Sequence, residues 1–80
     1  MNTAALIRDA APSPVRAQWC VGSNANCVSV LIENGDVVMA GTLIDNAAAH
    51  RGMAVAEVCR VRQGTREAAY ARLEPKANPT

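Results

Sequence analysis

The chain has 80 residues, enough for a single small domain whose hydrophobic core is thin. Eight basic and seven acidic residues give a net charge of +1, which excludes a strong electrostatic pull toward nucleic acid or an anionic membrane. The sequence contains no apolar run of the ~20 residues that span a bilayer and no signal-peptide pattern, so we expect a cytoplasmic protein.

Residues 1–14 predict a short helix followed by a proline-rich linker. Thr3 is a suitable helix-capping residue, and Pro12-Ser13-Pro14 ends the helix because proline cannot continue it. Apolar and polar residues then alternate from Val15 to Val21, which is typical of a half-buried strand. Trp19 lies on the apolar side of that strand and is expected to fill an unusual share of the core.

The stretch from Cys27 to Ile44 predicts a β-hairpin. Its centre is Asn34-Gly35, the dipeptide that most readily adopts the positive φ angles of a tight hairpin turn, and β-branched runs flank it on both sides. Folding the stretch about this turn gathers alternate apolar side chains on one face, and the register of the preceding strand adds its own apolar side there. These segments therefore predict a three-stranded antiparallel meander.

For residues 46–62, the sequence pattern is compatible with a strand and with a helix. Gly52 would cost a continuous helix about 1 kcal/mol, and the valines that follow it favour a strand, so we predict a fourth strand over residues 53–62. Gly64-Thr65 then predicts the start of a C-terminal helix over residues 65–74, followed by a tail over residues 75–80.

Together these elements predict one α+β domain over residues 1–80. A three- to four-stranded antiparallel sheet over residues 15–62 lies between short N-terminal and C-terminal helices. The second face of this sheet carries Leu31, Val38 and Ile44, and it is too apolar to be left to solvent. Either a helix covers that face or another protein does, and a homodimer is one of the arrangements left open.

Arginines gather in the second half of the chain, and Arg60 and Arg62 project from the same face of the fourth strand. They lack neighbouring aromatic side chains on which bases would stack, so an acidic protein surface fits them at least as well as nucleic acid does. We therefore predict a partner-binding surface made of Leu31, Val38, Ile44, Arg51, Arg60, Arg62 and Arg66.

Cys20, Cys27, Cys59 and the only histidine, His50, are a ligand set that zinc accepts. These cysteines lack the close spacing of a zinc knuckle, so we expect free thiols in a reducing compartment, with a Cys20–Cys27 disulfide as an alternative. A catalytic group of Cys59 or Cys27 with His50 and Asp45 would rest on residue types alone. We therefore expect neither an enzyme nor a cofactor-binding protein.

The middle half of the chain, from Trp19 through Gly35-Asp36-Val37-Val38 to Asp45-Asn46 and Gly52, resembles a small actinobacterial family of unknown function that includes the developmental regulator BldB. Asn26-Cys27-Val28-Ser29-Val30 matches the Asn-Cys-Val-x-Val pattern of that family. Asp45-Asn46-Ala47 departs from its turn motif, and Tyr70 with Leu73 stands where the family has an aromatic pair. The resemblance implies a small non-enzymatic regulator that works beside a helix-turn-helix transcription factor.

The sequence as a whole predicts a non-catalytic protein-binding regulator or inhibitor that masks the surface of a partner protein. A phage-encoded inhibitor of a host defence enzyme fits this description. A partner or antitoxin-like regulator of a helix-turn-helix transcription factor fits it too, and a small zinc- or thiol-dependent module is a further alternative. Nucleic acid and membranes are not expected as partners.

Overall fold

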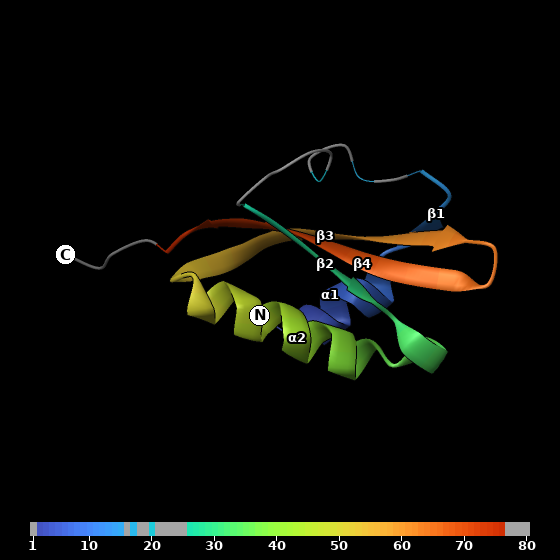
Figure 1. Ribbon diagram of the computed structural model, residues 1–80, viewed down its shortest axis with the longest axis horizontal. Helices are drawn as coiled ribbons and strands as arrows, with labels where there is room; N and C mark the ends of the chain where they lie inside the picture. The colour runs from blue at the N-terminus through green and yellow to red at the C-terminus, as the bar shows by residue number, and fades with distance from the viewer. Residues whose placement is uncertain (1, 16, 18–19, 21–25, 77–80) are drawn as a thin grey trace.

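The computed structural model describes residues 2–15, 17, 20 and 26–76. The elements follow the chain in this order: helix α1 (Thr3–Asp9), strand β1 (Pro12–Ser13), strand β2 (Cys27–Leu31), the 3-10 turn η2 (Glu33–Gly35), helix α2 (Val37–His50), strand β3 (Met53–Gln63) and strand β4 (Arg66–Pro75). Within these residues the strands form a four-stranded sheet in the order β1-β3-β4-β2, and both helices lie below it in Figure 1. The predicted α+β class is confirmed, but the sheet is mixed because β1 runs parallel to β3.

The predicted N-terminal helix is present, but Asn2 caps it instead of Thr3. The Asn2 side chain accepts hydrogen bonds from the backbone N–H groups of Ala4 and Ala5, at 2.9 and 3.4 Å. The Thr3 side chain is buried and donates a 2.5 Å hydrogen bond to the Asp45 carboxylate of α2. Thr3 therefore joins the two helices, while the cap comes from the residue before it.

The hairpin predicted from Cys27 to Ile44 is wrong, because only its first part is a strand. Asn34 and Gly35 do adopt positive φ angles, 55° and 72°, but the chain leaves this turn as helix α2. Asp36 is the competing signal. Its side chain accepts a hydrogen bond from the Met39 N–H at 3.0 Å and so caps the first turn of α2. This cap and the burial of one helix face outweigh the strand preference of the valines that follow.

Helix α2 buries one stripe of side chains against α1 and the sheet. The stripe consists of Val37, Ala40, Gly41, Ile44 and Ala48, a spacing that repeats with the helical period. At Gly41 the two helices approach closely, since a Cβ atom there would lie 2.7 Å from the backbone nitrogen of Ala4. The absence of a side chain at this position lets α1 dock directly on α2.

The fourth strand predicted over residues 53–62 is confirmed as β3, and the helix left open from residue 46 is present only as far as His50, the end of α2. The C-terminal helix predicted over residues 65–74 is wrong, because this segment is β4, joined to β3 by a tight turn at Gly64-Thr65. Along β4 the buried residues alternate with half-buried ones, and the buried ones are Ala69, Ala71 and Leu73. The long partner strand β3 therefore overrides the helix preference of an alanine-rich sequence.

The pairing register assigns the two faces of the sheet. Val28 and Val30 of β2 lie opposite the buried Ala71 and Ala69 of β4, so they face the helices and pack on the core. Cys27, Ser29 and Leu31 therefore point to the opposite face.

The strand predicted over residues 15–21, with Trp19 in its core, falls mostly outside the described residues, and so does most of the predicted tail. Among the described residues, no helix is long and apolar enough to cross a membrane.

Candidate functional site

The two edges of the sheet differ in how they are protected. At one edge β1 has only two residues, and a proline is one of them. At the other edge β2 has five residues, Cys-Val-Ser-Val-Leu, with neither a charged residue nor a proline among them. Exposed edge strands are usually kept short or guarded by charge or proline, because their open backbone groups pair readily with another strand. The residues of β2 itself supply none of these devices.

The outer edge of β2 presents backbone groups that the sheet does not use. The Ile32 N–H bonds the Glu67 carbonyl at 2.9 Å, and the Leu73 N–H bonds the Asn26 carbonyl at 2.7 Å. Since hydrogen-bonded pairs alternate along an antiparallel ladder, the even-numbered residues of β2 bond β4. The backbone groups of Cys27, Ser29 and Leu31 therefore point outward. Among the described residues, Arg51 contacts this outward row: its Nη1 donates to the Cys27 carbonyl at 3.4 Å.

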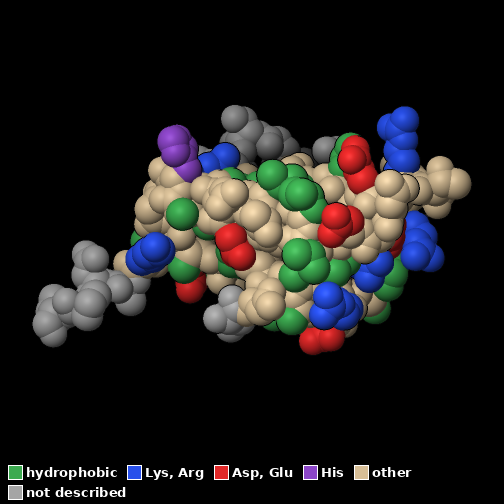
Figure 2. Space-filling view, turned by 90° about the horizontal axis from the view of Figure 1, so that it is seen from below, with side chains coloured by type: hydrophobic (Ala, Val, Ile, Leu, Met, Phe, Trp, Pro, Cys, Tyr) green, Lys and Arg blue, Asp and Glu red, His purple; other side chains and the backbone are tan. Residues whose placement is uncertain are grey.

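A groove with apolar walls runs beside this edge, between β2 and α2. Its volume is about 500 Å³, and it is lined by Val30, Leu31, Glu33, Asn34, Asp36, Met39 and Leu43. Leu31, Met39 and Leu43 are 61%, 55% and 46% exposed, high values for large apolar side chains. Figure 2, which views the helix side, shows exposed hydrophobic side chains in several small groups with acidic side chains between them. The groove therefore offers apolar contacts directly beside the open backbone groups.

The edge is charged with opposite signs at its two ends. Glu33 and Asp36 follow β2 and line the groove at the Leu31 end. At the Cys27 end lies the guanidinium of Arg51, held beside the outward carbonyl. The strand between these ends is uncharged. The β2 edge, with its groove and its two charged ends, is the candidate site, and we call it the β2 edge below.

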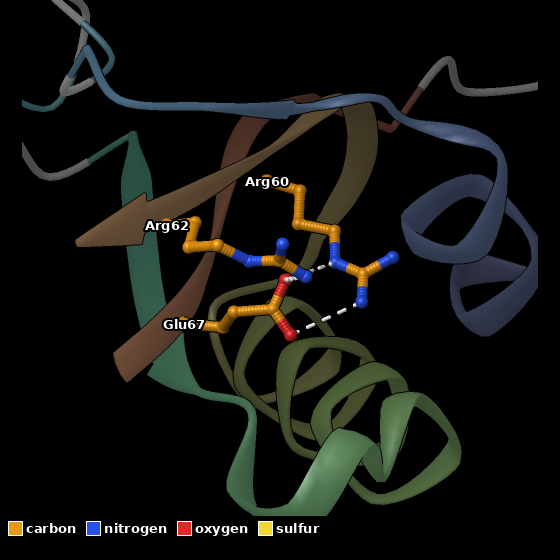
Figure 3. A network of polar contacts seen from close by, with 3 residues as sticks. All are labelled: Arg60, Arg62 and Glu67. Atoms are coloured by element: carbon orange, nitrogen blue, oxygen red, sulfur yellow. Dashed lines mark hydrogen bonds and ion pairs between the residues drawn. The ribbon is translucent and has the colours of Figure 1, made fainter. Parts of the chain in front are cut away.

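The predicted basic surface is not a single patch. Glu67 of β4 binds both Arg60 and Arg62 of β3, and Figure 3 shows the two guanidinium groups turned toward its carboxylate. Arg60 makes two of these contacts, at 2.8 and 3.1 Å, and its side chain is only 17% exposed. This hydrogen bonding to Arg60 holds the pKa of Glu67 below its ordinary value. Arg60 therefore neutralises an internal carboxylate instead of offering a free charge to a partner.

The other predicted contact residues are scattered. Leu31 and Val38 are exposed, as a contact surface requires. Ile44 is 0% exposed and lies in the core, so its place in the predicted surface is wrong, because it faces α1 and the sheet from inside helix α2. Arg51 lies before the start of β3 and Arg66 after its end, so most of a strand of about 36 Å separates them.

Sequence reasoning missed Ser29, Met39 and Leu43. The hairpin prediction placed Ser29 inside a meander and Met39 in a strand, which hid the edge and the groove. The available signal was the uncharged run Cys27–Leu31 followed by Asp36, a capping residue that starts a helix.

The cysteines form a disulfide and one free thiol. Cys20 and Cys27 are joined, with their Cα atoms 5.5 Å apart, so the expectation of free thiols is wrong for this pair. Cys59 is free and half-buried, and burial raises the pKa of its thiol, with Glu57 adding to the effect. Among the described residues, no three His, Cys, Asp or Glu side chains are grouped so that they could hold a metal ion.

The catalytic group considered from the sequence is not brought together. Cys59 is paired with Tyr70, on the sheet face away from the helices. Asp45 and His50 belong to α2 on the other side of the sheet, and the Asp45 carboxylate accepts the Thr3 hydroxyl. The sheet therefore separates the thiol from the acid and the imidazole.

A smaller cavity of about 290 Å³ lies between the helices and the start of β3, and Asp45 and Lys76 line it. Its most buried polar contact, between Thr3 and Asp45, holds α1 on α2. This cavity therefore reflects the packing of the helices, and the β2 edge remains the better candidate.

The chain matches no protein-family model, no curated protein and no solved structure. The resemblance to the BldB-like family therefore stays a prediction, and the function is argued from the geometry of the β2 edge.

Proposed function

We propose that this protein is a non-catalytic protein-binding module that pairs its β2 edge with an extended strand of a partner protein. The observation that carries the proposal is the row of outward backbone groups at Cys27, Ser29 and Leu31, on a strand that itself contains neither a charged residue nor a proline. Strand addition to such an edge is a common mode of peptide recognition: the main chain supplies affinity, and neighbouring pockets supply specificity.

The groove supplies the second part of this recognition. A strand lying along β2 would cover the exposed side chains of Met39 and Leu43 on the helix side of the sheet and that of Leu31 on the opposite face. Each new backbone hydrogen bond contributes about 0.5–1.5 kcal/mol net, and apolar burial adds about 25 cal/mol per Å². Because association itself costs several kcal/mol, we expect a dissociation constant of about 1–100 μM for a short peptide.

Such a module regulates without chemistry. A strand that pairs with β2 is itself covered, so a partner that needs the same strand for another interaction is inhibited while it is bound. Both a phage-encoded inhibitor of a host enzyme and a regulator of a transcription factor can act in this way, and the proposal covers both.

Peptide display tests the proposal. The protein is immobilised sparsely, so that its copies cannot pair, and a library of random displayed decapeptides is selected on it. The selection is repeated with Ser29→Pro, which removes an outward N–H without touching the bonds to β4, and with Ser29→Thr, which keeps that N–H.

We expect the wild-type protein and Ser29→Thr to enrich peptides with alternating apolar residues, and Ser29→Pro to lose them. Circular dichroism establishes that each variant is folded. Peptides that bind Ser29→Pro as well as the wild type, or a failure to enrich any peptide, would overturn the proposed function.

A further inference from the structure

We infer that the strand that fits the β2 edge is β2 of a second copy of this chain, paired antiparallel about a two-fold axis at Ser29. The inference rests on the proposed function, since it names the partner of the same edge. It is carried by two independent properties of the edge, its backbone register and the distribution of its charges.

The register of β2 is self-complementary. In an antiparallel pair, two residues exchange both backbone hydrogen bonds when the groups of both point toward each other. The outward residues of β2 are Cys27, Ser29 and Leu31, spaced evenly about Ser29. A two-fold axis at Ser29 pairs Ser29 with its own copy and Cys27 with Leu31 of the second copy. Every outward residue then has a partner, giving about six hydrogen bonds and a continuous sheet through both copies. Two of these bonds go to the Cys27 carbonyls, each of which then accepts from the second copy as well as from Arg51 Nη1 of its own chain.

The charges of the edge point to the same arrangement. Antiparallel pairing brings the Cys27 end of each copy against the Leu31 end of the other. Arg51, beside the Cys27 carbonyl, then faces the segment of the second copy that continues from Leu31 into Glu33. Neighbouring strands lie about 4.8 Å apart, so the Arg51 and Glu33 side chains are within reach of each other. The unlike charges meet twice, once on each side of the axis, and a parallel pairing would place like charges together.

The apolar side chains of α2 beside the β2 edge also fit against the same side chains of a second copy of the chain. Met39 and Leu43 stand one helical turn apart on α2 and line the groove beside β2. Because α2 follows β2 through the tight turn η2, the two-fold axis sets the α2 helices of the two copies next to the joined strands, running in opposite directions. The half-buried Val28 and Val30 and the exposed Met39 and Leu43 are then covered by the same residues of the second copy.

Sedimentation velocity over a concentration series tests the inference with the full chain. We expect the wild type to dimerise at concentrations of roughly 100 μM or below. Ser29→Pro is expected to raise the dimer dissociation constant on the order of 100-fold, because both central N–H groups are lost in the dimer. Glu33→Arg and Arg51→Glu are each expected to raise it about tenfold, because like charges then meet at both ends.

Mixing provides the decisive measurement. Glu33→Arg carries two basic groups at the contact and Arg51→Glu carries two acidic ones, so each repels itself but attracts the other. An equimolar mixture should therefore regain dimers with a dissociation constant near that of the wild type. Asp9→Arg is the matched control: it makes the same charge change as Glu33→Arg, on the exposed end of α1, and should leave the dimer unchanged.

The outcomes separate the two proposals. A wild type that stays monomeric while displayed peptides still require the Ser29 N–H overturns the second copy as partner and leaves the proposed function standing. A dimer that Ser29→Pro leaves intact overturns the second copy as the partner of the β2 edge, because the copies then meet elsewhere, and the peptide selection alone decides the proposed function. A dimer that Ser29→Pro weakens but that fails to recover on mixing the charge variants overturns the antiparallel register, and with it this inference.

Discussion

The close approach of α1 and α2 at Gly41 makes a specific prediction about stability. In Gly41→Ala, the added Cβ would lie 2.7 Å from the Ala4 backbone nitrogen and 3.0 Å from its Cα. These are backbone atoms, so the contact is relieved only if α1 moves as a whole. Overpacking of this kind costs about 1–3 kcal/mol, and alanine returns up to about 1 kcal/mol of helix propensity. We therefore expect a net destabilisation of about 1–2 kcal/mol.

Urea and thermal denaturation followed by circular dichroism measure this effect. For a domain of this size, the expected loss lowers the melting temperature by about 5–12 °C. Thr42→Ala is the neighbouring control, because its side chain is exposed and its change should stay within about 0.5 kcal/mol. A Gly41→Ala protein as stable as the wild type or more stable would refute the close docking of α1, since propensity alone would then decide the outcome.

Three further changes follow from described contacts. Arg60 lowers the pKa of Glu67, so the contact between these two side chains stabilises the folded state fully above the ordinary pKa of a glutamate. This stabilisation is lost as the pH falls through the lowered pKa of Glu67. Glu67→Gln should therefore flatten the fall in urea midpoint between about pH 5 and about pH 2. Asp36→Ala removes the cap of α2 and should lower the free energy of unfolding by about 1 kcal/mol, measured by urea titration at neutral pH. An unchanged free energy of unfolding would show that the cap does not stabilise the helix. Cys20→Ser opens the loop closed by the disulfide with Cys27, and should lower the free energy of unfolding by about 2.5 kcal/mol; an unchanged urea midpoint would argue against that bond.

Local sequence signals were sufficient to predict the end of an element where a proline or a glycine marks it. The prolines at positions 12 and 14 end the first helix, and α1 stops before them at Asp9. Gly52 interrupts the chain between α2 and β3, as the strand prediction required. Asn34-Gly35 adopts the expected left-handed backbone, although it leads into a helix. A turn residue thus fixes the local backbone but not the element that follows it.

The errors come from contacts that are distant in sequence. Residues 66–75 read as a helix by alanine content, yet they lie between β3 and β2, and this position decides their conformation. The valines after Asp36 read as a strand, yet the stripe from Val37 to Ala48 is buried with the helical period. In both segments the local preference competes with tertiary contacts, and the outcome cannot be predicted without knowing which segments become neighbours.

The candidate site was predictable only in part. Leu31 was expected to be exposed on an apolar surface, and it is exposed. Ile44 was expected beside it, but its burial depends on helix α2, which the hairpin prediction replaced. The β2 edge itself depends on the strand order β1-β3-β4-β2, in which the last strand of the chain separates β2 from β3. No pattern within β2 reports that order.

That strand order has a consequence for synthesis. β4 bonds both β3 and β2, so among the described residues β2 gains its neighbour in the sheet only when residues 66–75 have been made. While the ribosome is still translating β3, the growing chain can form its helices but not the sheet on which they dock. A message interrupted after β3 would therefore release a polypeptide whose apolar run Cys27–Leu31 lacks its partner strand β4, a species prone to aggregation and a ready target for quality-control proteases.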